Sequence, residues 1–415
     1  MLNGKRMIDR YEQVDFFSEN EYRRRQALVR DVMKKNDVDL ALILFASQDA
    51  FDQWLTGRRL LEELIVPAEG EITGVLLGDY DPSIFIDYLS ESENPDSQRA
   101  VFRPAEKPSA PDTVLVDAMT GPQLASYIAR YAPKRVGLIN PDAMTIPLRD
   151  SLQAALPSCE WVDITQEMSL KKVIKSEEEI SAIHTSNLIH ERIMQAMPQV
   201  LRQGRYIFDI QNEITDMLHQ LGSGNTLVHH WIIMAGDQTG ESDPSITMEP
   251  WPGYRLKAGD RAMILLESNG PGGHHVAIAR HFTLGPACEE YRRIVDVAAQ
   301  ALAFAASQMQ PGQNLREIAR KTCEFIESTG YVSCDQNFMH GLGLTYFEPY
   351  SLNHWSETIP LEENVFLHAH PIVRTFLHDE THTYRYESFV LDTFLVKPGG
   401  AVRTTSLPHN IIEIE

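Results

Sequence analysis

The pattern of apolar residues changes near residue 168, and the change predicts two domains of different architecture. Before this point, strand-like apolar runs alternate with helical segments, the first of which begins with a capping-box spacing at Ser18 and Glu21. After it, long amphipathic helices are separated from paired strands. Alternation indicates an α/β layer, whereas segregated helices and strands are typical of an α+β domain. We therefore expect an α/β domain over 1–165 and an α+β domain over 168–415.

Length and composition exclude several classes of protein. A chain of 415 residues is long enough for two cores, because single domains usually stop growing at about 250–300 residues. The net charge of −21 and the lack of a basic stripe argue against nucleic acid or an anionic membrane as a partner. The sequence has no apolar run of the roughly 18 residues that span a bilayer and no signal-peptide pattern. Its four cysteines show no CxxC spacing. These features predict a cytoplasmic protein.

The histidines are distributed unevenly along the chain. All fifteen follow residue 183, from His184 to His409. Imidazole titrates near neutral pH and is the commonest metal ligand in proteins. We therefore expect the chemistry of this protein to lie in its second domain.

Residues 265–285, LLESNGPGGHHVAIARHFTLG, have the form of a hairpin that carries reactive groups. Glu267 ends the first strand, and His274 and His275 follow the glycine-rich turn. Ala277 and Ala279 occupy the middle of the second strand, where such a site is expected to place polar groups. Successive strand residues point to opposite faces, so we expect only one of the two histidines in the pocket and favour His274.

Several segments of the second domain resemble motifs of the family of creatinases, prolidases and methionine aminopeptidases. KKVIKSEEEISAI resembles the beginning of the shared domain, and MHGLGLTYFEP resembles the strand G-H-G-I-G-x-x-x-H-E-x-P. GGHHVAIARHFTLG, EENVFLHAHP and YRYESFVLDT resemble G-Y-x-S-D-x-T-R-T-x-x-x-G, G-M-V-F-T-I-E-P and R-I-E-D-x-V-L-V-T. The resemblance covers roughly 168–400. It implies the pita-bread fold for 168–415, and the smaller creatinase-type α/β domain before it.

The resemblance also implies a set of metal ligands. Peptidases of this fold hold two metal ions with two Asp, one His and two Glu. Ala277 has no side-chain donor, so a two-metal peptidase site is not expected. The remaining ligand-capable groups suit one divalent transition metal ion, Fe, Mn or Zn. The alternative is a metal-free site, as in creatinase, which also has Ala at this position. The matching positions are Glu267, Ala277, His340, His370 and Glu387.

Further site residues follow from the same resemblance. Phe347 replaces the second histidine of the H-G-x-G-x-x-x-H-E motif, which contacts substrate in the peptidases. A phenyl ring there makes the pocket drier, and a dry pocket raises the pKa of a carboxyl group such as that of Glu348, which favours a general acid. TGRRLL contains Arg58 and Arg59, in a loop that binds the substrate carboxylate in the partner's pocket of creatinase-like dimers. We therefore expect a homodimer.

These residues favour a hydrolase that cleaves a C–N bond of a small carboxylate-bearing metabolite. Amidino compounds, ectoine-like cyclic amidines and N-acyl amino acids fit, whereas standard proline peptides do not. One alternative is a lyase of the dimethylsulfoniopropionate type, which has the same fold but keeps more carboxylate ligands. Another is a non-catalytic binding module, as in histone-chaperone subunits, which have lost the polar pocket. The catalytic candidates are Glu267, His274, His275 and Glu348.

Overall fold

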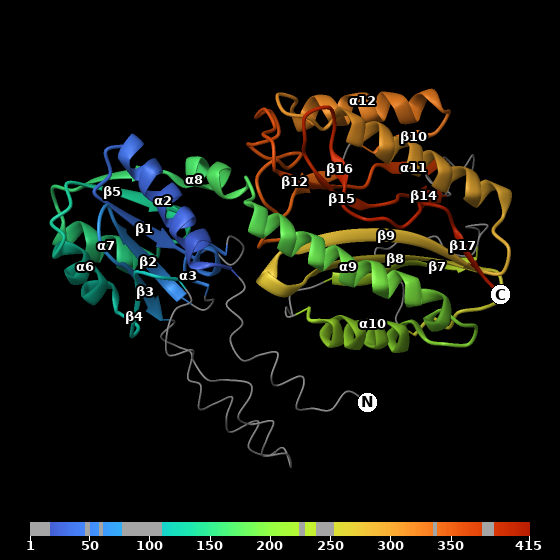
Figure 1. Ribbon diagram of the computed structural model, residues 1–415, viewed down its shortest axis with the longest axis horizontal. Helices are drawn as coiled ribbons and strands as arrows, with labels where there is room; N and C mark the ends of the chain where they lie inside the picture. The colour runs from blue at the N-terminus through green and yellow to red at the C-terminus, as the bar shows by residue number, and fades with distance from the viewer. Residues whose placement is uncertain are drawn as a thin grey trace, which may run out of the picture. The chain divides into compact units, whose positions relative to one another are not determined.

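The structure is a computed structural model that describes residues 17–45, 50–57, 61–76, 110–223, 229–237, 253–334, 338–375 and 386–415. The chain divides between Lys172 and Val173 into two compact units (Figure 1). The boundary between the units lies a few residues later in the chain than the sequence predicts, because helix α8 belongs to the first unit. Glu167 of this helix pairs with Lys35 at 2.6 Å, and Met168 is buried.

The first unit is an α/β layer built on one mixed sheet. Its six strands have the order β4-β3-β2-β1-β5-β6, with β1 antiparallel to β2 and parallel to β5. Apolar residues of α6 and α7 pack against β1 in one core. Ser18 caps the first described helix by accepting from the Glu21 amide, as the sequence predicts. The elements are α2 (Glu19–Lys35), β1 (Leu40–Leu44), α3 (Phe51–Thr56), β2 (Leu61–Pro67), β3 (Ile72–Leu76), β4 (Thr113–Val116), α6 (Gly121–Ala129), β5 (Arg135–Ile139), α7 (Ile146–Ala155), β6 (Glu160–Asp163) and α8 (Thr165–Lys172).

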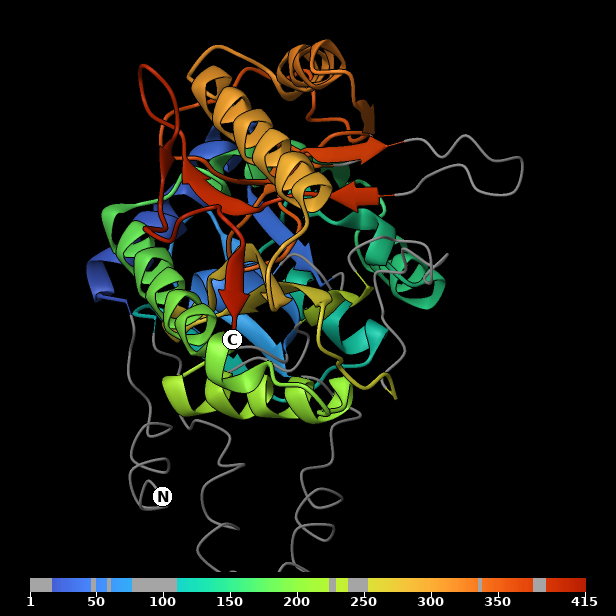
Figure 2. The same cartoon turned by 90° about the vertical axis from the view of Figure 1, so that its right-hand side faces the viewer.

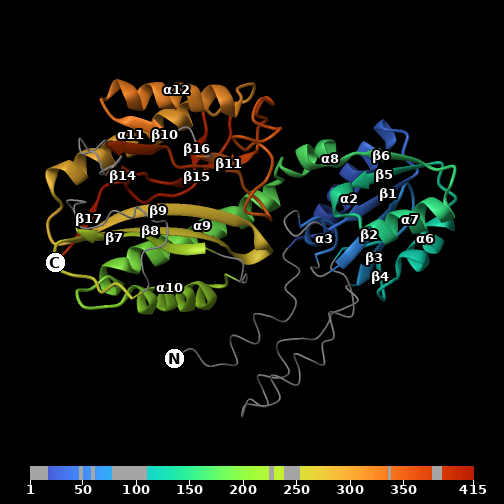
Figure 3. The same ribbon diagram turned by 180° about the vertical axis from the view of Figure 1, so that it is seen from behind.

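The second unit has the α+β architecture that the sequence predicts. Its longest strands, β7, β8 and β9, belong to a sheet of order β17-β9-β8-β7, and two sheets of shorter strands have the orders β11-β12-β15-β16 and β10-β13-β14. Helices α9 and α10 lie on one side of the long strands, and α11 and α12 lie on the other (Figures 1 and 3). The elements are α9 (Glu177–Val200), α10 (Ile207–Leu221), β7 (His229–Asp237), β8 (Asp260–Asn269), β9 (His275–Leu284), α11 (Glu289–Gln308), α12 (Leu315–Ser328), β10 (Val332–Cys334), β11 (Met339–Gly341), β12 (Phe366–Ala369), β13 (Ile372–Thr375), β14 (Tyr386–Ser388), β15 (Asp392–Leu395), β16 (Val402–Arg403) and β17 (Ile412–Ile414).

The two faces of the β8–β9 hairpin are buried by different partners. Directly opposed residues in antiparallel strands share a face, and neighbours along one strand alternate between faces. Leu266 and Ile278 pair in register and pack against α9 and α10 in an extensive apolar core. The opposite face is directed away from these helices. Figure 2 views the same strands end-on, with α10 below them and α9 to their left.

Local sequence signals define where α9 begins. Ser176 accepts a hydrogen bond from the Glu179 amide, and the Glu179 carboxylate accepts from the Ser176 amide. This reciprocal pair is the capping box that the sequence predicts. No helix within the described residues combines the length and the apolar character needed to cross a bilayer.

Candidate active site

Glu267 lies on the face of the β8–β9 hairpin that is turned away from α9 and α10. Two residues of β9 on the same face, Ala277 and Ala279, are apolar. The register partner of Glu267 is Ala277. Ala277 and Ala279 are completely buried and pack with Leu265 and Phe389 in a small apolar cluster. The second strand therefore supplies no side-chain oxygen to the pocket at the position where the family motif has its Asp.

Three imidazoles gather on strand β11, on the neighbouring strand β12 and just after the end of β12. His340 lies directly opposite His368, and their ring centroids are 3.5 Å apart. His370 follows two residues later, and its ring centroid is 5.1 Å from that of His368. The motif match had selected His340 and His370 and missed His368. The alternation of histidines in FLHAHP was the available signal, since residues two apart in a strand share a face.

Tyr346 connects the carboxyl group with the imidazoles. Its hydroxyl donates a hydrogen bond of 2.5 Å to Glu267 Oε1. Its ring centroid is 4.9 Å from that of His340 and 5.7 Å from that of His368. The structure thus brings together two of the predicted groups, Glu267 and His340, through a residue that sequence reasoning missed. Tyr346 occupies a variable position of the motif, so motif matching had no reason to select it.

The loop that carries Tyr346 is closed by backbone hydrogen bonds and by a buried ion pair. The Glu348 amide donates to the Gly341 carbonyl at 3.0 Å. The Glu348 carboxylate pairs with Lys175, and both side chains are only 1% exposed. A Cβ atom on Gly343 would overlap the Glu348 carboxylate, so any other residue at this position would force that side chain to move. Glu348, predicted as a catalytic acid, instead fixes the loop, because its carboxylate is held by a buried cation.

Burial changes the ionisation of the groups in the pocket. Burial raises the pKa of Glu267 to about 7, although the hydrogen bond from Tyr346 opposes the change. Burial also lowers the pKa of His340 to about 3 and that of His370 to about 4. The pKa of His368 lies well below its usual value for the same reason, reinforced by the two neighbouring imidazoles. Near pH 7 the pocket therefore combines uncharged imidazoles with a carboxyl group that exchanges its proton readily.

The two histidines of the hairpin are directed to different environments. His274 Nε2 lies 3.5 Å from the Glu179 carboxylate at the beginning of α9. The His275 amide donates to the Gly343 carbonyl at 2.7 Å, and its Nδ1 lies 3.3 Å from the same oxygen. His275 thus lies beside the loop that carries Tyr346. The preference for His274 was wrong, because the strand alternation turns His274 toward α9.

Of the remaining predicted site residues, the structure describes the side chain of Phe347 but not those of Glu387, Arg58 and Arg59. Phe347 is 47% exposed, and its ring centroid is 4.0 Å from that of His340, so it lies at the edge of the pocket and not in a core. Glu387 belongs to β14, but its side chain lies outside the described part of the structure. Arg58 and Arg59 also lie outside the described residues.

The residues do not fit a two-metal centre. Ala277, which lies opposite Glu267, has no donor atom that two metal ions could share. Among the described side chains, no group of three or more His, Cys, Asp or Glu is arranged to hold a metal ion. Both ring nitrogens of His368 are buried without a hydrogen-bond partner within the described residues. Burying such nitrogens without a partner is costly, so a ligand that pairs with them would be stabilised.

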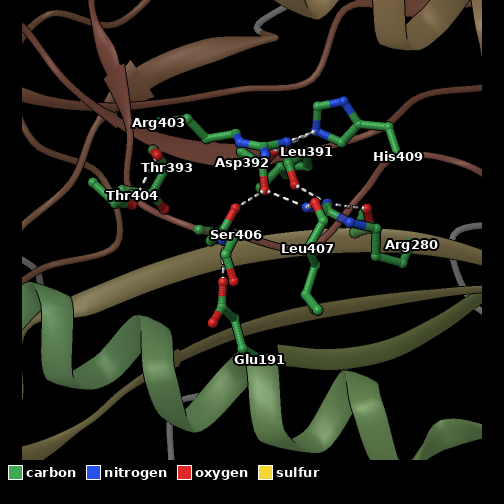
Figure 4. Close-up of polar contacts among 12 residues, drawn as sticks. Glu191, Arg280, Leu391, Asp392, Thr393, Arg403, Thr404, Ser406, Leu407 and His409 are labelled. Carbon is green, nitrogen blue, oxygen red and sulfur yellow. Dashed lines mark hydrogen bonds and ion pairs between the residues drawn. The ribbon is translucent and has the colours of Figure 1, made fainter.

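A second buried polar cluster stabilises the C-terminal segment (Figure 4). Arg280 of β9 pairs with Asp392 of β15 at 2.7 Å and donates to the Leu407 carbonyl at 3.0 Å. Asp392 also accepts from the Thr405 hydroxyl at 2.7 Å and contacts His409 at 2.5 Å. Arg280 is the arginine of the family's T-R-T motif. Both terminal nitrogens of its guanidinium group are hydrogen-bonded within the protein, so we interpret the cluster as structural.

Solved structures show where this fold occurs. An X-Pro aminopeptidase from Thermotoga maritima is 15% identical, with a TM-score of 0.71 over 94% of this chain and 99% of that one. The dipeptidase PepE from Mycobacterium ulcerans is 17% identical, with a TM-score of 0.70 over 96% and 99% of the two chains. At these identities the likeness concerns the fold alone. It confirms the prediction of a pita-bread domain preceded by a smaller α/β domain.

Curated relatives and the family comparison agree with this fold. An uncharacterised hydrolase/peptidase of Sinorhizobium fredii is 24% identical over 65% of this chain and 66% of its own length. An uncharacterised peptidase of Staphylococcus epidermidis is 23% identical over 51% of this chain and 58% of its own length. The chain therefore matches less than two thirds of each relative. Residues 181–398, more than half of the chain, match an enzyme family whose members typically bind divalent metal ions. The chain belongs to metallopeptidase family M24.

Proposed function

We propose that this protein hydrolyses a C–N bond in a small carboxylate-bearing metabolite and is not a proline peptidase. The observation that supports this proposal is the register of the hairpin, which sets Ala277 opposite Glu267 on the pocket face. A pair of metal ions about 3.5–4 Å apart acts as one clamp on the reacting oxygens and depends on the ligands between them. With Ala277 in an apolar cluster, that ligand is absent. Amidino compounds, ectoine-like cyclic amidines and N-acyl amino acids are the proposed substrates.

The side chains of the pocket supply the proton transfers of such a hydrolysis. Glu267 accepts a proton from water while the water oxygen forms its bond to the carbon. It returns that proton to the departing nitrogen as the C–N bond breaks. Tyr346 orients the carboxyl group through its hydrogen bond. The uncharged His368, together with His275 beside the loop, supplies hydrogen bonds to the substrate.

The proposal includes the metal content of the pocket. We expect at most one divalent ion, Fe, Mn or Zn, bound through His340, His370 and one or both of Glu267 and Glu387, or a pocket that works without metal. Elemental analysis of the purified protein measures the stoichiometry directly. Two tightly bound ions per chain would contradict the proposal.

A substrate comparison tests the proposed activity. Purified protein is incubated with Xaa-Pro dipeptides plus Mn or Co and, separately, with creatine-like amidines, cyclic amidines and N-acyl amino acids. We expect release of an amine or ammonia from one of the metabolite classes and none from the dipeptides. A Glu267→Gln protein provides the background rate. Efficient Xaa-Pro hydrolysis would show that the chain is a proline peptidase despite Ala277.

A further inference from the structure

The ring of Phe347 covers the ring of His340 at the edge of the pocket. The two ring centroids are 4.0 Å apart, and the ring planes are tilted by 34°, so a face of the imidazole is covered by the phenyl group. Phe347 is 47% exposed, whereas His340 is 1% exposed. His368, which is completely buried, contacts the same imidazole with a centroid distance of 3.5 Å. Exposure therefore falls in the order Phe347, His340, His368.

The backbone around Phe347 is held by hydrogen bonds, whereas its side chain is half exposed. The Thr345 hydroxyl donates to the Phe347 carbonyl at 3.0 Å, and the next amide, that of Glu348, donates to the Gly341 carbonyl at 3.0 Å. The Phe347 ring packs against His340 and, edge-on, against Tyr346 at a centroid distance of 4.7 Å. Exposed side chains change rotamer in picoseconds to nanoseconds, far faster than loops move. The ring can therefore turn away from His340 while the loop stays in place.

One ring nitrogen of His340 carries a lone pair that an entering molecule could use. Nδ1 lies 3.1 Å from the Gly341 carbonyl oxygen, which can only accept a hydrogen bond. An uncharged imidazole has one N–H and one bare nitrogen, so the proton lies on Nδ1 and the lone pair on Nε2. The hydrogen bond to Gly341 therefore leaves Nε2 as the reactive atom of this ring.

From this arrangement we infer that the Phe347 side chain is the gate of the pocket, and that its rotation admits molecules to His340. A closed gate keeps bulk water away from the imidazole, and an open one uncovers the imidazole without unfolding the loop. The inference goes beyond the proposed function because it concerns entry and not the reaction. It rests on the proposed function only for the location of the pocket.

Chemical modification of His340 tests the gate without a substrate. Diethyl pyrocarbonate transfers a carbethoxyl group to a bare imidazole nitrogen, with release of ethanol and carbon dioxide. Full-length wild type, Phe347→Ala, Phe347→Leu and Phe347→Trp are treated at pH 7 in a buffer that contains a chelator. Fragmentation mass spectrometry then gives the rate at each histidine. The rate at His340 should rise about tenfold in Phe347→Ala, which corresponds to ~1.4 kcal/mol less for uncovering the ring. Leu should give an intermediate rate, and Trp a rate no faster than that of wild type.

Three residues serve as controls for this experiment. His184 is exposed on α9 and should be modified at the same rate in every protein, which checks the reagent. Phe208→Ala removes another half-exposed ring, 44% exposed on α10, and should leave the rate at His340 unchanged. His281 is completely buried, with both ring nitrogens hydrogen-bonded, so its modification would report unfolding.

Two results would overturn the inference. One is a rate at His340 that stays within about twofold of wild type in Phe347→Ala. The other is a Phe347→Trp protein that is modified as fast as Phe347→Ala. If Phe347→Ala exposes His281, the Phe347→Leu protein decides between gate and no gate. A lack of activity on every proposed metabolite would refute the proposed function and leave the modification rates standing.

Discussion

The carboxyl group of Glu267 is buried, is hydrogen-bonded to Tyr346 and has a pKa near neutrality. Burial in an apolar environment disfavours the charged form, and the hydrogen bond only partly compensates. A group with such a pKa can accept and donate a proton at neutral pH with little free-energy cost in either direction. This property makes Glu267 the residue on which the proposed hydrolysis depends most.

Replacing Glu267 with Gln should therefore remove activity without unfolding the protein. The amide oxygen keeps an acceptor for Tyr346, but the side chain no longer exchanges a proton. We expect kcat to fall by about 10²–10⁴-fold, the usual contribution of general acid–base catalysis. Steady-state kinetics and a thermal melt measure the two effects. Glu362→Gln, at an exposed position, is the control. A kcat within about threefold of wild type would show that Glu267 transfers no proton.

At the scale of elements, the pocket depends on contacts between segments that are far apart in the chain. Lys175 precedes α9, and Glu348 follows β11, yet their side chains form a buried ion pair. The loop between β11 and Glu348 carries Tyr346 and Phe347. This ion pair therefore links the beginning of the second unit to the wall of its pocket.

Breaking this ion pair from one side should destabilise the second unit strongly. Lys175→Met leaves the Glu348 charge buried without its cation, which typically costs about 3–5 kcal/mol. Adding Glu348→Gln should recover part of that loss, because the uncompensated charge is removed. The exposed pair Lys397–Glu363 is the control, and Lys397→Met should change the free energy of unfolding by no more than about 1 kcal/mol. Denaturant unfolding measures all four proteins. Equal effects of Lys175→Met and Lys397→Met would contradict the prediction.

The cluster around Asp392 should make stability depend on pH. Burial by itself raises the pKa of Asp392, but the charge of Arg280 and the contacts of His409 and Thr405 lower it overall below 3.8. A carboxyl group with a lowered pKa in the folded state stabilises the protein above its unfolded pKa. That contribution is lost as the pH falls through the folded pKa. The free energy of unfolding should therefore fall at acid pH, and part of that fall should come from Asp392.

The Asp392→Asn variant tests this dependence of the free energy of unfolding on pH. The difference in the free energy of unfolding between wild type and variant should be constant above about pH 5 and should shrink below about pH 4. Urea unfolding between pH 7 and the acid limit of folding measures it. Asp216→Asn, at an exposed position of α10, is the control and should show no such change. A difference that stays constant down to the acid limit would mean that Asp392 does not stabilise the protein through its charge.

At the scale of the whole molecule, the chain combines a complete family fold with an altered pocket. The fold comparisons cover 94% of this chain and 99% of a solved relative. The change lies in a few side chains of the central strands, above all Ala277. A pocket of this kind can acquire new chemistry without a change in architecture, because function depends on the site and not on the fold.

The proposed homodimer predicts that each pocket uses arginines from the partner subunit. Replacing Arg58 or Arg59 with Ala should weaken substrate binding about tenfold or more without affecting folding, since ~1.4 kcal/mol is a factor of ten. Lys should restore only part of the loss, because it lacks the bidentate fork of Arg. A chain with both arginines replaced is then mixed with a His340→Ala chain. Partial activity should return in the mixed dimer, where one pocket combines wild-type residues from both chains. Verified mixed dimers without activity would refute the shared pocket.

Much of the fold could be predicted from the sequence because the signals are local. Ser18 and Ser176 mark the beginnings of α2 and α9, as the structure confirms, although only Ser176 forms the full reciprocal capping box. The change from alternating to segregated elements separates the two units. The motif order predicts the pita-bread fold, and the alanine at position 277 already argues against a two-metal site. Each of these inferences depends on residues within one segment or on the order of segments.

The composition of the pocket, in contrast, was decided by the tertiary structure. His368 joins His340 because β11 and β12 pair in one register. Tyr346 contacts Glu267 because a loop closes across residues 79 positions apart in sequence. Glu348 is held by Lys175, and His275 rather than His274 lies beside this loop. Spacing along the chain specifies which face of a strand a residue occupies. It does not specify which strand or loop lies opposite, because that depends on long-range packing of the whole unit.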